Sequence, residues 1–138
     1  MRFLVIRKAD EETEAGVMPS EQLVADMAAY VQALVDAGIM RSGDGLKPSA
    51  QGARLQFSNG TPTVTDGPFT ETKELVAGLS VWECASLDEA VAWARRWPVI
   101  DGHGNVALEI RPFYEVEDFG EGAGVDHHVR LREQMAGA

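Results

Sequence analysis

Residues 75–84 constrain the fold more than any other part of the chain. This segment has the length of a β-strand, contains no proline, and alternates between two sets of side chains: Ala77, Leu79 and Val81 on one side, and Val76, Gly78, Ser80 and Trp82 on the other. Both sets are largely apolar, so neither face of the sheet that holds this strand can be left fully in water. The fold therefore needs a covering layer on each side of one sheet.

Two helices and several strands surround this segment in the sequence. A helix is predicted near residues 20–37, opened by Pro19 and Ser20 and followed by Gly38. A second helix starts at Ser86, where Glu89 completes a capping box, and it ends before Pro98. Apolar patterning predicts strands at 3–6, 39–46 and 106–113, while the acidic stretch 9–17 is predicted to be a loop.

Residues 53–65 are predicted to form a β-hairpin. Ala53, Leu55 and Phe57 alternate with polar residues, and Asn59-Gly60 is a strong signal for a two-residue turn. The returning segment contains a proline, which favours an edge strand. The hairpin is therefore an insertion in the series of strands and helices.

The order of these elements predicts an α+β fold, namely a ferredoxin-like sandwich with an inserted β-hairpin. Two helices cover one face of its sheet, and a second copy is the simplest cover for the other. A homodimer with two sheets face to face is therefore expected, with the same patch used on both copies. We assign residues 1–118 to the ferredoxin-like domain and residues 119–138 to a C-terminal tail with a short helix at 125–134.

Composition restricts the partners. The 138 residues suit one domain, and the formal net charge of −10 argues against direct binding of nucleic acid or of an anionic membrane. Cys84 is the only cysteine, so no intramolecular disulfide forms, and a buried thiol is preferred over a nucleophile. No run is long enough to span a membrane and residues 1–7 do not resemble a signal peptide, so a cytoplasmic location is the simplest inference.

The polar stretch at residues 66–74, DGPFTETKE, is the candidate functional site. Asp66 can cap the turn, Gly67 can adopt a positive φ, and the next residue is proline. Asp66, Glu74 and Lys73 are the catalytic candidates, because carboxylates and a lysine can supply acid–base groups and an anion anchor. The candidate substrate-binding residues, which would converge on a cleft between this turn and the sheet, are Asp44, Phe69, Trp82 and Arg111. A structural interpretation stays open for several of them: Asp66 could hold its turn, Lys73 and Glu74 could be surface charges, and Trp82 could belong to the core.

The sequence implies no metal and no cofactor. His127 and His128 are adjacent, and neighbouring side chains on a helix point about 100° apart, so they form a poor chelate. His103 lies in a glycine-rich turn and is interpreted as a mobile surface residue. Neither a phosphate-binding glycine loop nor a nucleophile elbow is present in the sequence.

The stretch at residues 66–69 also resembles the DGPF signature of the YCII-related family. Four further segments resemble parts of that family, so the similarity covers nearly the whole chain: 43–49 (GDGLKPS), 86–90 (SLDEA), 109–112 (EIRP) and 117–120 (EDFG, as in the tail of the DGPF subgroup). This resemblance implies a dimeric α+β barrel.

The resemblance implies two competing functions. Some YCII-related proteins are similar to small enzymes that use a histidine near the start of the first helix. This chain has Pro19-Ser20-Glu21-Gln22-Leu23 there, so only a carboxylate could take that role. Members of the DGPF subgroup resemble accessory proteins of extracytoplasmic-function sigma factors. We therefore expect a binding or regulatory module with a sigma-factor partner. The alternative is a cofactor-independent enzyme, lyase- or isomerase-like, that transfers a proton on a small hydrophobic or aromatic acid.

Overall fold

The computed structural model describes residues 1–70 and 74–137. It has a mixed α+β fold with antiparallel sheets, as the sequence predicts. Its main sheet has the strand order β2-β5-β1-β6, with the bounds Arg2–Lys8 (β1), Met40–Gly45 (β2), Val76–Glu83 (β5) and Leu108–Pro112 (β6). A separate two-stranded sheet pairs β3 (Ala53–Ser58) with β4 (Thr61–Asp66), and this is the β-hairpin.

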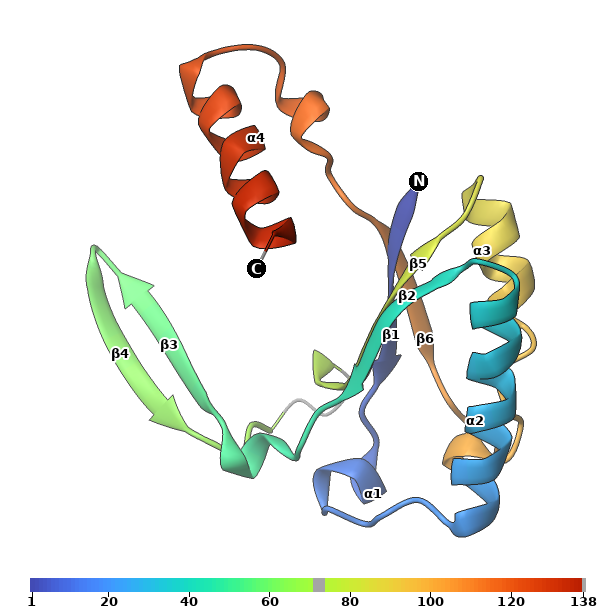
Figure 1. Ribbon diagram of the computed structural model, residues 1–138. Helices are drawn as coiled ribbons and strands as arrows, with labels where there is room; N and C mark the ends of the chain where they lie inside the picture. The colour runs from blue at the N-terminus through green and yellow to red at the C-terminus, as the bar shows by residue number, and fades with distance from the viewer. Residues whose placement is uncertain (71–73, 138) are drawn as a thin grey trace.

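Helices α2 and α3 lie on one side of the main sheet (Figure 1). Helix α2 (Glu21–Asp36) begins where the Ser20 hydroxyl accepts a hydrogen bond from the Leu23 amide at 3.1 Å. Helix α3 (Leu87–Ala94) begins at Ser86, which caps the Glu89 amide at the same distance. Both helix starts are therefore confirmed at the residues that the sequence indicates.

The helix-covered face of the sheet holds the core. Phe3 pairs across the strands with Trp82, and both side chains are 0% exposed. Leu34 of α2 belongs to the same core cluster and is 1% exposed. The Tyr30 hydroxyl donates a hydrogen bond to the Trp93 carbonyl at 2.6 Å. Burial raises the pKa of Tyr30 to about 12, against the opposing effect of the Arg96 charge, so Tyr30 stays a neutral donor in this core.

The opposite face of the main sheet, which we call the open face, has an apolar centre and polar edges. Directly paired residues of antiparallel strands share a face, so the strand register defines two rows across it. These rows are Asp44-Leu79-Ile6-Glu109 and Ser42-Val81-Leu4-Arg111. The four central side chains are half-buried. The two-sided apolar character predicted for residues 75–84 is thus confirmed.

The predicted loop at 9–17 contains a short helix, α1 (Glu11–Glu14), so that prediction was wrong in part. Asp10 accepts a hydrogen bond from the Thr13 amide at 2.8 Å, and the Thr13 hydroxyl accepts one from the Asp10 amide at 2.9 Å. This reciprocal cap stabilises a single turn. One turn is too short to produce an apolar period, which is why the sequence pattern did not indicate it.

The C-terminal segment contains a 3₁₀ turn, η4 (Val116–Phe119), and helix α4 (Ala123–Ala136), which extends beyond the predicted 125–134 at both ends. Two further 3₁₀ turns are η1 (Ser49–Gln51) and η3 (Asp101–Gly104). The hairpin and α4 both project on the open-face side of the sheet, away from α2 and α3 (Figure 1). Among the described residues, none of the helices has the length and apolar character needed to cross a membrane.

Candidate functional site

The DGPF segment, residues 66–69, is built into the base of the hairpin. The Gly67 amide donates to the Gly52 carbonyl at 3.1 Å, which extends the pairing of β3 and β4. A Cβ atom at position 67 would lie 1.7 Å from the Ser49 carbonyl oxygen. Gly67 is not among the glycines with a positive φ, so the predicted reason for this glycine was wrong. Its role is to allow two backbone segments to approach closely.

Ser49 connects the DGPF segment with α1. The Glu14 carboxylate accepts hydrogen bonds from the Ser49 amide, at 3.0 Å, and from the Ser49 hydroxyl. The same hydroxyl accepts a hydrogen bond from the Phe69 amide at 3.0 Å. One serine therefore joins three segments that are far apart in the sequence, and it fixes the hairpin base relative to the main sheet.

Phe69 lies between a cation and a small cavity. The Arg54 guanidinium carbon is 4.2 Å from the centre of its ring, which is the geometry of a cation–π contact. The cavity has a volume of about 210 Å³, and its lining residues are Glu14, Leu46, Lys47, Ser49, Phe69, Leu75 and Val76. Pockets for drug-sized ligands are larger, roughly 300–1,000 Å³. This cavity suits a ligand smaller than a drug molecule, and two of its polar side chains, Glu14 and Ser49, already bind each other.

No hydrogen bond or ion pair joins the catalytic candidates among the described residues. Asp66 ends β4, where it is exposed, and within the described part of the chain its carboxylate has no hydrogen-bond partner. Glu74 is exposed two residues before β5. Lys73 lies outside the described residues. The turn cap expected of Asp66 is therefore not formed by any described residue.

The four substrate-binding candidates lie in three different places. Asp44 and Arg111 are on the open face at its two edges, separated by β5 and β1, which corresponds to about 14 Å across the sheet. Arg111 is 70% exposed and its Nη1 is 3.7 Å from the Glu109 carboxylate. Trp82 is on the helix-covered face, so it does not line a cavity with Phe69. The structure does not bring these residues together within one chain.

A buried ion pair that sequence reasoning missed lies at one end of the helix-covered face. Arg7 binds Asp101 through two hydrogen bonds, 2.7 and 3.2 Å long, and both residues are buried. The Trp97 indole also donates to Asp101 at 2.8 Å, and Asp10 accepts from Arg7 at 3.2 Å. The available signal was the alternation of β1, which places Arg7 on the same side as the core residues Phe3 and Val5.

The electrostatics of this pair are those of a structural anchor. Burial alone would raise the pKa of the Asp101 carboxyl, but the hydrogen bonds from Arg7 and Trp97 outweigh burial and lower that pKa below its ordinary value. The pKa of Asp10 is lowered in the same manner, against burial, by the Thr13 amide and Arg7. Both acids are therefore held as carboxylates, which suits ion pairing and not proton transfer near neutral pH.

The histidines and the cysteine add no reactive cluster. His103 is exposed, and its Nε2 is 3.0 Å from a Glu12 carboxylate oxygen. No group of three potential metal ligands occurs among the described residues. Cys84 is 3% exposed, and burial raises the pKa of its thiol, which confirms the buried thiol predicted from the sequence.

Comparison with known proteins gives the family. The sequence model of the YCII-related domain family matches residues 1–114, and the chain belongs to this family. An uncharacterized protein of Rhizobium meliloti (strain 1021) is 41% identical over 75 residues, which are 54% of this chain and 60% of that protein. The matched segment thus spans less than two thirds of that relative's length.

A solved structure gives a weaker likeness. It is the 5-chloro-2-hydroxyhydroquinone dehydrochlorinase of Burkholderia phenoliruptrix AC1100, in complex with 2,5-dihydroxybenzoquinone. The two chains are 18% identical with a TM-score of 0.48, and the similarity covers 83% of this chain and 95% of the dehydrochlorinase.

Proposed function

We propose that this YCII-related chain is a cytoplasmic, homodimeric binding module that regulates a partner protein, and that its ferredoxin-like halves pack open face to open face. The observation that carries this proposal is that the DGPF segment makes structural contacts. Gly67 and Phe69 are engaged, through Ser49, in contacts that hold the hairpin to the main sheet. The most distinctive motif of the sequence therefore has a structural role that needs no substrate.

The open face supports the dimer. Its four central side chains, Leu4, Ile6, Leu79 and Val81, are apolar, while its edges carry Asp44 at β2 and Glu109 and Arg111 at β6. A twofold axis would stack two such centres and place the charged edges at the rim, which is the usual division of an interface. The charges at the rim would then set the orientation of the two sheets.

The distribution of charged residues supports a binding role. The catalytic candidates that are described are exposed, and the three described carboxylates with a lowered pKa are engaged by arginines of β1: Asp10 and Asp101 by Arg7, and Glu115 by Arg2. The net charge of −10 favours encounter with a basic partner surface. A sigma factor, which must bind DNA, offers such a surface. The resemblance to sigma-factor accessory proteins points to the same partner.

One observation favours the enzymatic alternative. The cavity of about 210 Å³ beside Phe69 is lined by a carboxylate, a lysine and apolar side chains, and this combination could hold a small hydrophobic or aromatic acid. The alternative requires Glu14 or Glu74 to exchange a proton with that ligand.

A paired experiment tests the proposal. Thermal unfolding of the wild type, Glu74→Gln and Glu14→Gln is measured with a library of small carboxylic and aromatic acids, and affinity-tagged protein is incubated with the extracytoplasmic-function sigma factors of the same organism. We expect a sigma factor to be retained, and no acid to stabilise the wild type in a manner that depends on either glutamate. Glutamate-dependent stabilisation without sigma-factor binding would replace the module by the enzyme.

A further inference from the structure

One face of the β3–β4 hairpin is apolar apart from Asp66, which pairs with Ala53 at the hairpin base, and its apolar side chains are exposed. Paired residues share a face, so Leu55 lies beside Val64, and Phe57 beside Pro62. Leu55, Phe57 and Val64 are 53%, 63% and 65% exposed. An isolated two-stranded ribbon is only marginally stable in water, because it has no layer against which to bury such a face. This hairpin therefore needs a covering surface.

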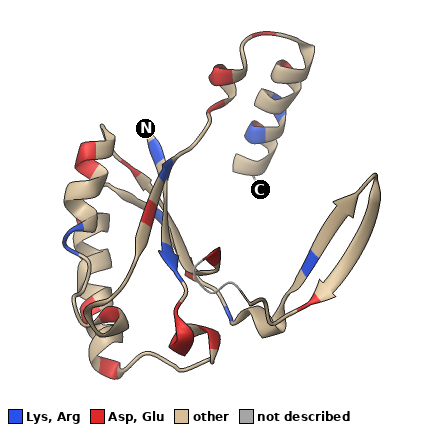
Figure 2. Ribbon diagram, turned by 180° about the vertical axis from the view of Figure 1, so that it is seen from behind, with Lys and Arg blue, Asp and Glu red and all other residues tan. Residues whose placement is uncertain are grey.

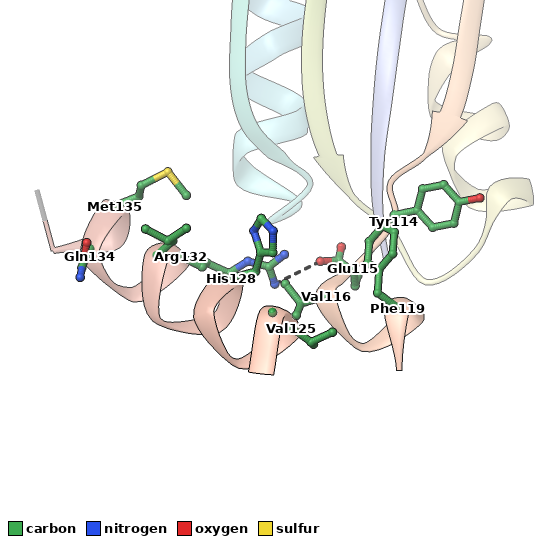
Figure 3. A pocket seen from close by; sticks show the side chains of 11 residues that line it. Tyr114, Glu115, Val116, Phe119, Val125, His128, Arg132, Gln134 and Met135 are labelled. Atoms are coloured by element: carbon green, nitrogen blue, oxygen red, sulfur yellow. Dashed lines mark ion pairs between the residues drawn. The ribbon is translucent and has the colours of Figure 1, made fainter. Parts of the chain in front are cut away.

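Another apolar surface is a groove formed by η4 and α4, which we call the tail groove (Figure 3). It has a volume of about 850 Å³. Its apolar lining side chains include Tyr114, Val116, Phe119, Val125, Leu131 and Met135. The rings of Tyr114 and Phe119 lie 5.3 Å apart yet are 75% and 65% exposed, and no described side chain of α4 is buried. Much of the apolar lining of the groove is thus exposed within a single chain.

Ion pairs fix the tail groove on the open-face side of the sheet. Arg2, at the start of β1, donates two hydrogen bonds to Glu115, 2.8 and 3.1 Å long. These hydrogen bonds, which outweigh slight burial, lower the pKa of the Glu115 carboxyl. Arg132 of α4 also lies 3.5 Å from that carboxylate (Figure 3). The groove is therefore attached to the main sheet, on the side where the hairpin also projects (Figure 1).

The two surfaces match in length and in charge. Strands of six residues extend about 20 Å. Helix α4, with 14 residues, is about 21 Å long. Residues 53–66 carry only one basic and one acidic residue, as the nearly uncoloured hairpin in Figure 2 shows. Residues 115–137 carry six acidic and two basic residues, so a neutral ribbon approaches them with less repulsion than an acidic segment would.

We infer that the hairpin of one protomer lies in the tail groove of the second copy, so that two copies exchange these arms reciprocally. The inference rests on the proposed open-face dimer, because that packing brings a second copy to the side from which both arms project. Within one chain the two surfaces are exposed together. A twofold partner supplies a hairpin for each groove and a groove for each hairpin.

Photo-crosslinking with isotope mixing tests the exchange. The variant Phe57→p-benzoylphenylalanine is prepared in ¹⁴N and ¹⁵N forms, which are unfolded together, refolded, irradiated and digested. We expect crosslinks from position 57 to peptides of residues 114–135, with half of the linked pairs carrying mixed labels. The matched control, Gln56→p-benzoylphenylalanine, places the probe on the polar face of the same strand, and it should lose these crosslinks. Leu55→p-benzoylphenylalanine repeats the test at a second apolar position.

Native mass spectrometry of the same mixture distinguishes a failure of the arm exchange from a failure of the open-face dimer. Mixed-label dimers without mixed-label crosslinks to the tail would overturn the exchange of arms and leave the open-face dimer in place. Crosslinks to the tail within single-label pairs only, in the presence of mixed dimers, would show that the hairpin folds onto its own tail, and would also overturn the exchange. Monomers alone would overturn the dimer on which the inference rests.

Discussion

The two faces of the main sheet are built from the same strands but are completed differently. On the helix-covered face, Phe3 and Trp82 of adjacent strands are 0% exposed, because α2 and α3 close over them. On the open face, their neighbours Leu4 and Val81 remain half-buried. Sequence alternation made both faces apolar, yet among the described residues α2 and α3 both lie on the same face. This difference between the faces is the basis of the proposed open-face dimer, in which a second copy covers the face that α2 and α3 leave open.

The largest expected effect is on the helix-covered side. Arg7→Met would leave the buried carboxylate of Asp101 without its cation, and losing one partner of a buried pair costs about 3–5 kcal/mol. Urea unfolding of the variant measures this loss. Arg7→Met combined with Asp101→Asn should recover part of the stability, since the stranded charge is gone. Equal unfolding free energies for wild type and Arg7→Met would show that the pair anchors nothing.

The same pair predicts how stability depends on pH. The pKa of Asp101 is lower in the folded protein than in the unfolded chain, so its contribution is fully present above the unfolded value, about 3.9. It is lost as pH falls through the folded pKa. Asp10 acts in the same direction. Unfolding measured between pH 2.5 and pH 6 should show a shallower acid loss in Asp101→Asn than in the wild type, and parallel curves would contradict the assignment.

A smaller effect is expected where the hairpin joins the main sheet. Gly67→Ala places a methyl group 1.7 Å from the Ser49 carbonyl oxygen, and relieving such overlap costs about 1–3 kcal/mol. Because the clash is at the hairpin base, we expect faster tryptic cleavage after Arg54 while the near-ultraviolet signal of the tryptophan core is kept. Loss of the core signal at the same rate as cleavage would show that hairpin and core unfold as one unit.

The smallest expected effects are the stability losses of two substitutions at the hairpin base, at Ser49 and at Asp66. Ser49→Ala removes the hydroxyl that binds Glu14 and Phe69, which we expect to cost about 1–2 kcal/mol. Asp66→Ala changes an exposed carboxylate and should stay within about 0.5 kcal/mol of wild type. Thermal unfolding of both variants gives the ranking. A larger loss for Asp66→Ala would restore the turn cap that the sequence predicted.

The sequence predicted local features well because their causes are local. Ser20 and Ser86 cap the helices they were expected to cap, and Asn59-Gly60 closes the hairpin. The candidate site was less predictable, because its contacts join segments distant in the sequence. Ser49 meets Phe69 only after the hairpin folds, and Arg7 meets Asp101 only after α3 crosses the sheet. The motif also suggested backbone freedom at Gly67, whereas close packing explains that glycine.

The most direct test of the open-face dimer is the mass of the protein in solution. Size-exclusion chromatography with light scattering at micromolar concentration should give twice the 14.9 kDa of one chain. The variant Ile6→Arg, with a charge in the centre of the open face, should give a folded species of single-chain mass. A wild-type mass of 14.9 kDa would contradict the account, because the open face would then be stable without a second copy.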